Sequence, residues 1–204
     1  MYKADAAFLK LQISRENLVR WLDSPAPPAS KWQDWRSIGG EWSFKDGERP
    51  IADISETELQ ENVAKCDQRL SQRTNREVLR DVLKSADAPF LKRATYDAKT
   101  SEFVAGTVAY SANLLDAIVF LTLARGATDH LGPDNHGIAV IHNYIWGDNS
   151  EKITRAAMRL GPGARSEFMA EAEKASAAGA FQGLAMDMLN KRQPAAVDEL
   201  ESLR

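Results

Sequence analysis

One stretch of the chain is apolar on nearly every side of the helix that it predicts. Six large apolar residues surround the helix axis: Leu114, Leu115, Ile118, Val119, Leu121 and Leu123. Ser111 or Asn113 would cap its start, and it would end near Arg125 and Gly126. A helix that is apolar all round has to be buried within a protein or a membrane. The apolar run 117–124 falls far short of the roughly 20 residues that span a bilayer, so we expect a buried central helix and no membrane contact.

Length, charge and cysteine content narrow the class of protein further. The chain has 204 residues with 26 Lys and Arg against 29 Asp and Glu, a net charge of −3. This size suits a single domain, and the slightly acidic balance argues against a general nucleic-acid binder. Cys66 is the single cysteine, which suits a reducing compartment. Lys10 and Gln12 interrupt the N-terminal apolar stretch, so no secretory signal is expected and we predict a cytoplasmic protein.

The first half of the chain predicts a strand, short helices and a long polar helical region. Alternation predicts a strand over 7–13, and Ser14 caps a helix over 15–22. A Pro-rich loop covers 24–30, and a strand over 41–44 enters a tight turn at 45–47. Apolar spacing predicts helix from about 55 to 86. Thr74 and Asn75 interrupt this region, so it is either one helix or two.

The second half predicts hairpins followed by helix. Two alternating runs, 91–95 and 103–109, predict a hairpin, and 137–146 predicts a strand before a turn at 147–150. Residues 153–160 fit either a second hairpin arm or a helix. Residues 166–190 favour helix, and 193–204 suggest a frayed, charged helical tail. The expected fold is one α+β domain over 1–204, with antiparallel hairpins packed against several helices and a helix-rich composition overall.

The three histidines are one candidate for chemistry. His130, His136 and His142 all fall in the segment 130–142, with Asp134 between them. Imidazole and carboxylate groups bind metals, so these four side chains could serve a small metal-dependent hydrolase or a ligand-binding domain. Their regular spacing of six positions does not match the i, i+4 spacing of two ligands on one helix. The alternative is that each histidine has a structural role.

A line of basic residues is a second candidate. Lys65, Arg69, Arg73, Arg76, Arg80 and Lys84 recur every three or four positions. On one continuous helix they would form a positive ridge about 28 Å long. The ridge would suit an acidic partner surface, whereas the absence of stacking aromatic residues makes nucleic acid an unexpected partner. The alternative is an ordinary solvated helix face. If the ridge forms, the net charge of −3 is an average over this basic ridge and more acidic flanks.

Four of the five tryptophans are clustered beside the Pro-rich loop. Trp21, Trp32, Trp35 and Trp42 all lie in the partly irregular segment 21–42. Such residues either anchor a partner protein or pin an irregular segment to the core. On the first interpretation, Trp32, Trp35 and Trp42 would share a partner-binding surface with the arginines of the ridge.

The order of these segments resembles that of small bacterial immunity proteins. The resemblance includes the helix opened by Ser14-Arg15-Glu16-Asn17 and the sequences Tyr110-Ser111-Ala112-Asn113-Leu114 and Tyr144-Ile145-Trp146-Gly147-Asp148. It implies a cytoplasmic protein that neutralises a cognate toxin by direct contact, without catalysis and without a cofactor. No functional residue is transferred from it. The sequence also lacks a Gly-x-Ser-x-Gly motif, so we expect a non-catalytic binding protein, with the metal-dependent domain as the alternative.

Overall fold

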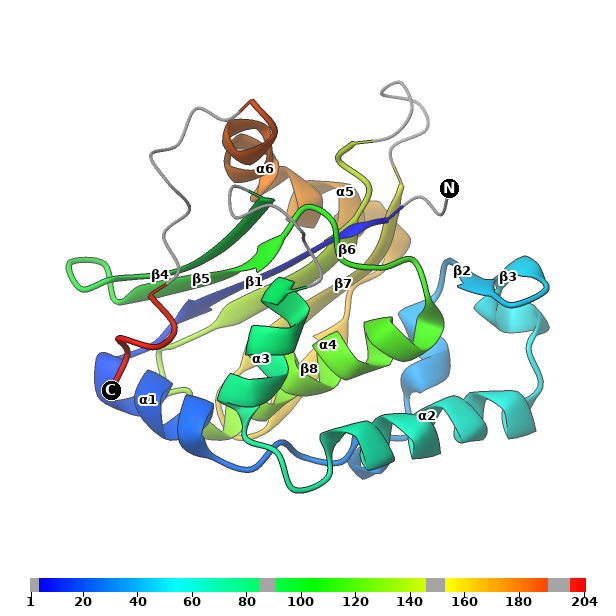
Figure 1. The fold of residues 1–204 in the computed structure, drawn as a ribbon, viewed down its shortest axis with the longest axis horizontal. Coiled ribbons are helices and arrows are strands. Elements are labelled where there is room, and N and C mark those ends of the chain that lie inside the picture. Colours follow the sequence, from blue (N-terminus) through cyan, green and yellow to red (C-terminus); the bar gives the residue numbers. More distant parts are fainter. Residues whose placement is uncertain (1–3, 85–90, 146–152, 191–198) are drawn as a thin grey trace.

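A six-stranded antiparallel sheet forms the centre of the molecule (Figure 1). The computed structural model describes residues 4–84, 91–145, 153–190 and 199–204. The sheet has the order β4-β5-β1-β6-β7-β8. Its strands are β1 (Ala6–Gln12), β4 (Lys92–Asp97), β5 (Glu102–Thr107), β6 (Gly137–His142), β7 (Thr154–Gly161) and β8 (Arg165–Phe168).

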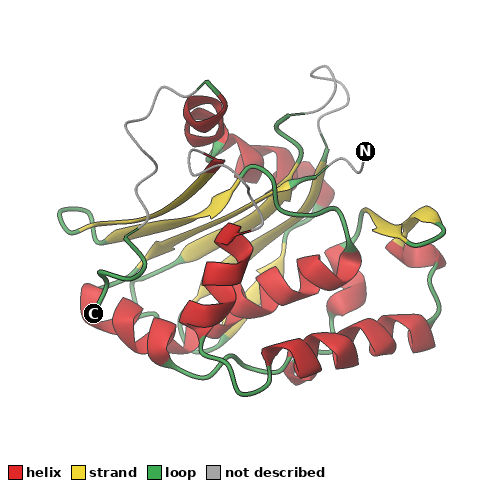
Figure 2. Ribbon diagram, in the orientation of Figure 1, coloured by secondary structure: helices red, strands yellow, loops and turns green. Residues whose placement is uncertain are grey.

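Helices cover both faces of this sheet (Figure 2). One face carries α1 (Arg15–Asp23), α2 (Glu56–Leu70), α3 (Asn75–Lys84) and α4 (Leu114–Gly126). The other face carries α5 (Glu171–Gly179) and α6 (Gln182–Leu189). A separate hairpin, β2 (Glu41–Phe44) with β3 (Gly47–Pro50), lies beside the sheet. The predicted α+β class is therefore confirmed.

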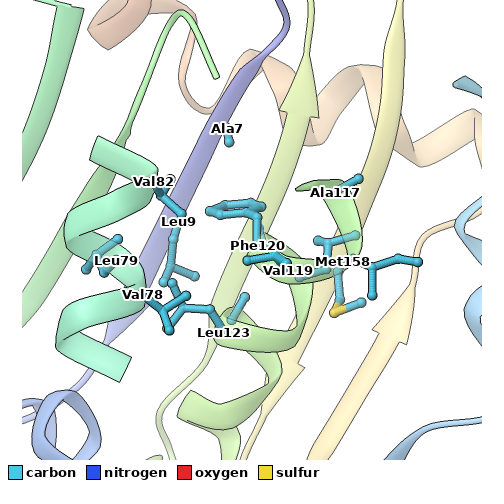
Figure 3. Close-up of a cluster of buried hydrophobic side chains, with 14 of the residues drawn as sticks. Ala7, Leu9, Val78, Leu79, Val82, Ala117, Val119, Phe120, Leu123 and Met158 are labelled. Atoms are coloured by element: carbon cyan, nitrogen blue, oxygen red, sulfur yellow. The ribbon is translucent and has the colours of Figure 1, made fainter. Parts of the chain in front are cut away.

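Strand β1 lies in the sheet interior and contributes to two hydrophobic cores. Leu9 and its odd-numbered neighbours face α1–α4, whereas Phe8 faces α5 and α6. The predicted central helix α4 is buried along almost its whole length. Its Phe120 and Leu123 pack with residues of β1 and α3 in the larger core (Figure 3). A helix that is apolar on most sides is thus accommodated between the sheet and other helices.

The long polar helical region consists of two helices. The break falls at residues 71–74, where Gln72 has a φ of 59°. Thr74 starts α3 with a reciprocal cap: its backbone N–H donates to the Glu77 carboxylate at 2.8 Å, and its hydroxyl accepts from the Glu77 N–H at 3.3 Å. This cap directs α3 away from the axis of α2 (Figure 1).

The region after residue 153 differs in part from the sequence prediction. Residues 154–161 form the hairpin arm β7, so this segment is a strand and not the helix that the sequence also allowed. The helix predicted from residue 166 is wrong at its start, because 165–168 form β8. Gly163 and Ala164 adopt positive φ values of 68° and 60°, which closes a hairpin between β7 and β8. The turn predicted at 147–150 lies outside the described residues.

The end of the chain does not match the predicted frayed helix where it is described. Residues 200–202 form a turn, and the side chains of Leu200 and Leu203 are buried. The Glu199 N–H donates to the Ala94 carbonyl at 2.8 Å, so this segment covers the outer edge of β4. The burial of Leu200 and Leu203 therefore outweighs the charged residues that predicted a frayed helical tail. Residues 193–198 lie outside the described part.

Among the described residues, none of the helices is both long enough and apolar enough to cross a membrane.

Candidate binding surface

The tryptophan cluster is mostly internal. Trp35 and Trp42 are buried, and their indole N–H groups donate to the carbonyls of Ala29 at 2.8 Å and Gly39 at 2.7 Å. These contacts pin the irregular segment between α1 and β2 to the core. This corrects the expectation that Trp35 and Trp42 lie on a contact surface, since burial leaves them inaccessible. Trp32 is partly exposed and remains available to a partner.

Trp32 and Trp35 instead surround a buried arginine. The Arg125 guanidinium lies 5.1 Å from the Trp32 ring centre, 4.7 Å from Trp35 and 4.8 Å from Phe168. Asp34 accepts two hydrogen bonds from it, each 2.7 Å long. The Arg125 side chain is fully buried, whereas that of Asp34 is 44% exposed. Trp32 and Trp35 therefore form, together with Phe168, a cation–π box around Arg125 that joins α4 to β8.

The predicted basic ridge does not form as one continuous surface, because the chain turns between α2 and α3. Each of its four arginines contacts a carboxylate; the pairs are Arg69–Asp116 (2.6 Å), Arg73–Asp81 (2.7 Å), Arg76–Asp23 (2.8 Å) and Arg80–Glu201 (2.6 Å). Arg76 also donates to the carbonyls of Leu200 and Leu203. These arginines therefore connect parts of the fold.

The histidines are not brought together. His136 precedes β6 and His142 ends it, which separates them by about 20 Å along the strand. His142 lies 2.9 Å from the Thr154 hydroxyl in a buried contact. Burial lowers the pKa of His130, and Asp134 is exposed. Across the residues that the structure describes, His, Cys, Asp and Glu side chains form no group of three that could hold a metal.

The β2–β3 hairpin and the start of α2 form a projection at one side of the molecule (Figure 1). We name residues 41–61 the acidic lobe. The hairpin is braced where it meets the rest of the fold: the Ser43 N–H donates to the Ala112 carbonyl at 2.9 Å, and Asn113 donates to the Ser43 carbonyl at 3.1 Å. Most of the hairpin residues are exposed or only partly buried.

Arg155 of β7 is the main polar connection between the hairpin and the sheet. Its guanidinium contacts Asp5 at 2.5 Å and Glu48 at 3.1 Å, and it also donates to the Glu41 carbonyl. Asp5 is 1% exposed, and burial raises the pKa of its carboxyl while Arg155 acts in the opposite direction. Gly40 has a φ of 72°, and a Cβ there would lie 2.9 Å from the Arg155 carbonyl oxygen. Backbone and side chains therefore fix the hairpin closely against β7.

The helical side of the acidic lobe is held by two further arginines. Arg49 contacts Glu58 at 2.6 Å, and this hydrogen bond raises the pKa of Arg49. Arg36 donates to the carbonyls of Ile51 at 3.0 Å and Ile54 at 3.2 Å and contacts Glu56 at 2.9 Å. Hydrogen bonds, first from Gln60 and then from Arg36, lower the pKa of Glu56.

The acidic lobe concentrates negative charge. It contains seven carboxylates and two basic side chains, which gives the segment a net charge of −5. Because the whole chain has a net charge of −3, the rest of the chain carries +2. Arg36, Lys65 and Arg155 contact carboxylates of the lobe from outside it and reduce its charge to −2. Six of the seven carboxylate side chains belong to exposed residues: Glu41, Asp46, Glu48, Asp53, Glu56 and Glu61.

A second surface feature lies between α6 and the strands β4, β5 and β1. It is a hollow of about 300 Å³, and the ion pair of Lys10 with Glu102, 2.7 Å long, lies along it. Arg93 and Asp97 add one charge of each sign, so this hollow favours neither cations nor anions.

Sequence reasoning noted acidic flanks but did not locate the acidic lobe. A running count of charge along the chain would have found it, because the excess is contiguous in sequence. The role of Arg155 left no such signal, since its partners lie more than 100 positions away. Comparisons with protein-family models, curated proteins and solved structures find no match to this chain.

Proposed function

We propose that this chain is a non-catalytic binding protein, an immunity-type inhibitor that neutralises a cognate bacterial toxin by direct contact in the cytoplasm. The observation that carries the proposal is the acidic lobe, a mostly exposed hairpin and helix start that the rest of the fold braces. An isolated two-stranded hairpin is marginally stable in water. Here Arg155, Asn113 and Ala112 hold it in place, so its surface is presented in one conformation. Loops and hairpins on a rigid scaffold are common binding elements, because little conformational entropy is lost on association.

The proposal is tested by co-expression. Each product of the genes next to that of this chain would be produced in a host cell with and without the chain. We expect one of them to arrest growth alone, and the chain to restore growth and to co-elute with it as a complex. Failure to restore growth or to bind any of these products would reject the proposal.

Stoichiometry separates binding from catalysis. With the purified toxin, we expect inhibition to be complete at a fixed molar ratio and to stop increasing beyond it. Inhibition of a large excess of toxin by a small amount of the chain would show turnover and contradict a non-catalytic mechanism.

A further inference from the structure

We propose that two copies of this chain associate through strand β8, whose outer edge pairs antiparallel with the same edge of the second copy. The pairing would join the two sheets into one continuous sheet, and the inference is independent of the proposed function. Strand β8 is the last strand of the six-stranded sheet, so one of its sides has no neighbouring strand. An open strand edge presents backbone N–H and C=O groups that pair readily with another strand.

The two edges of the sheet differ in how the chain covers them. At the β4 edge, the Glu199 N–H donates to the Ala94 carbonyl at 2.8 Å, and the Tyr96 N–H donates to the Glu199 carboxylate at 3.0 Å. At the β8 edge, a hollow of about 580 Å³ adjoins the strand and is lined in part by Trp32 and residues 164–167. The described part of the chain therefore covers one edge of its sheet and leaves space beside the other.

The register of β8 against β7 shows which backbone groups face outward. The Met169 N–H donates to the Ala157 carbonyl at 2.9 Å, and successive residues of an antiparallel strand alternate in direction. The backbone of Glu167 therefore also faces β7, whereas the N–H and C=O groups of Ser166 and Phe168 face away from it. Backbone hydrogen bonds from other described elements do not reach these outward groups. They are therefore available to a second strand.

The side chains of β8 identify a second copy as the occupant. Arg165 and Glu167 are both exposed and lie on the same face of the sheet, because side chains alternate along a strand. Ion pairs between described residues include neither of them, and Arg165 donates only to the Pro162 carbonyl, at 2.9 Å. Two unpaired charges of opposite sign, two positions apart on an open edge, are complementary to the same strand in the reverse direction.

One symmetric register makes this complementarity explicit. When Ser166 lies opposite Ser166 of the second copy, each Arg165 lies opposite Glu167 of the other copy, and two opposite-charge pairs form across the contact. A register shifted by two positions places Glu167 opposite Glu167, where like charges are unfavourable. The favoured contact uses the same surface on both copies, so it closes at a dimer.

Sedimentation velocity of the full chain between about 1 µM and about 300 µM measures this association. We expect a monomer–dimer equilibrium whose heavier species has twice the mass of one chain. A monomer at every concentration would overturn the inference. A series of larger oligomers would contradict it as well, because the symmetric contact closes at two copies.

Reversal of the two charges makes the test specific to this register. In Arg165→Glu both contacts become Glu–Glu, and in Glu167→Arg both become Arg–Arg, so each variant should dimerise about tenfold more weakly. The double variant should return to within about threefold of the parent chain, and an equimolar mixture of the two single variants should form a heterodimer. If the single variants dimerise like the parent chain, or if neither the double variant nor the mixture restores the contact, the proposed register is wrong.

Two further variants control for net charge and test the backbone pairing. Arg20→Glu and Glu16→Arg make the same charge changes on the exposed surface of α1 and should leave the dissociation constant within about twofold of the parent value. Ser166→Pro removes an outward N–H and keeps the hydrogen bonds to β7, since proline is tolerated on strand edges whose N–H faces solvent. We expect a folded monomer by circular dichroism and sedimentation, and a folded Ser166→Pro chain that still dimerises like the parent would refute pairing through β8.

Discussion

The box around Arg125 makes an asymmetric prediction about its two charged members. Replacing Asp34 with Asn leaves a fully buried guanidinium without its anion. The Nε of Arg125 already has no hydrogen-bond partner, so the remaining cation would rely on three aromatic rings and on the single amide oxygen of the substituted side chain. An uncompensated buried charge of this kind costs about 3–5 kcal/mol. For a chain of this length, that corresponds to a decrease in Tm of roughly 6–20 °C.

Replacing Arg125 with Met should cost much less. The Asp34 side chain is 44% exposed, so its carboxylate regains water when the arginine is removed. Methionine fills part of the space between the rings, and the loss is then mainly the cation–π attraction, about 1–2 kcal/mol. In the double variant the cost should remain near that of Arg125→Met alone, so the coupling free energy equals the cost of Asp34→Asn, about 3–5 kcal/mol.

Urea unfolding followed by far-ultraviolet circular dichroism measures these free energies of unfolding. It does not depend on the fluorescence of Trp32 and Trp35, whose surroundings the substitutions change. Glu16→Gln is a matched control, because its ion pair with Arg20 is largely exposed and should contribute less than about 0.5 kcal/mol. Unfolding of Asp34→Asn at the same urea concentration as the parent chain would refute the predicted asymmetry, and so would a larger destabilisation in Arg125→Met than in Asp34→Asn.

Three further predictions concern the interior of the fold. Burial raises the pKa of Cys66 to about 12, so Ellman's reagent should leave the native thiol unmodified at pH 8 and react fully in urea; rapid reaction of the folded chain would show that the thiol is accessible. The pKa of Asp5 is raised, so its contribution to stability is greatest below 3.8 and decreases as the pH rises through the raised pKa; Asp5→Asn should become more stable relative to the parent as the pH rises. Carboxyl ¹³C titration measures this pKa directly, and a value at or below 3.8 would mean that Arg155 outweighs burial. Leu203→Ala should lower the free energy of unfolding by about 2–4 kcal/mol because Leu203 is 2% exposed, whereas Ser202→Ala should change it little; equal small effects would mean that the C-terminal segment contributes no packing.

Sequence patterns located most elements of the fold because their signals are local. The alternation of β1, the apolar surface of α4 and the interruption at Thr74 and Asn75 each depend on a few neighbouring residues. The order of strands in the sheet, by contrast, depends on pairings between distant segments, as in the antiparallel contact of β1 with both β5 and β6. Strand β8 was missed because it is short and lies next to a helix-favouring region, and the turn at Gly163 and Ala164 determines its direction.

The candidate surface was harder to predict than the fold. Trp35, Trp42 and the ridge arginines have the composition of a contact surface, but burial and ion pairing assign them to the interior or to links between elements. Whether an aromatic or basic side chain faces solvent depends on tertiary packing, which no local pattern reports. The acidic lobe is the opposite case, because its charge excess is contiguous and needs only the structure to place it at one side.

The interior position of β1 has a consequence for how the chain becomes folded in the cell. Ala7 pairs with Thr107 and Ile141, 100 and 134 positions further along the chain. At synthesis rates of about 5–20 residues per second, the first strand waits roughly 7–27 seconds for the second of these partners to be made. Such long-range pairing slows folding in general. The edge of β1 that pairs with β6 therefore lacks its partner on the nascent chain throughout that interval, even after β5 has been made.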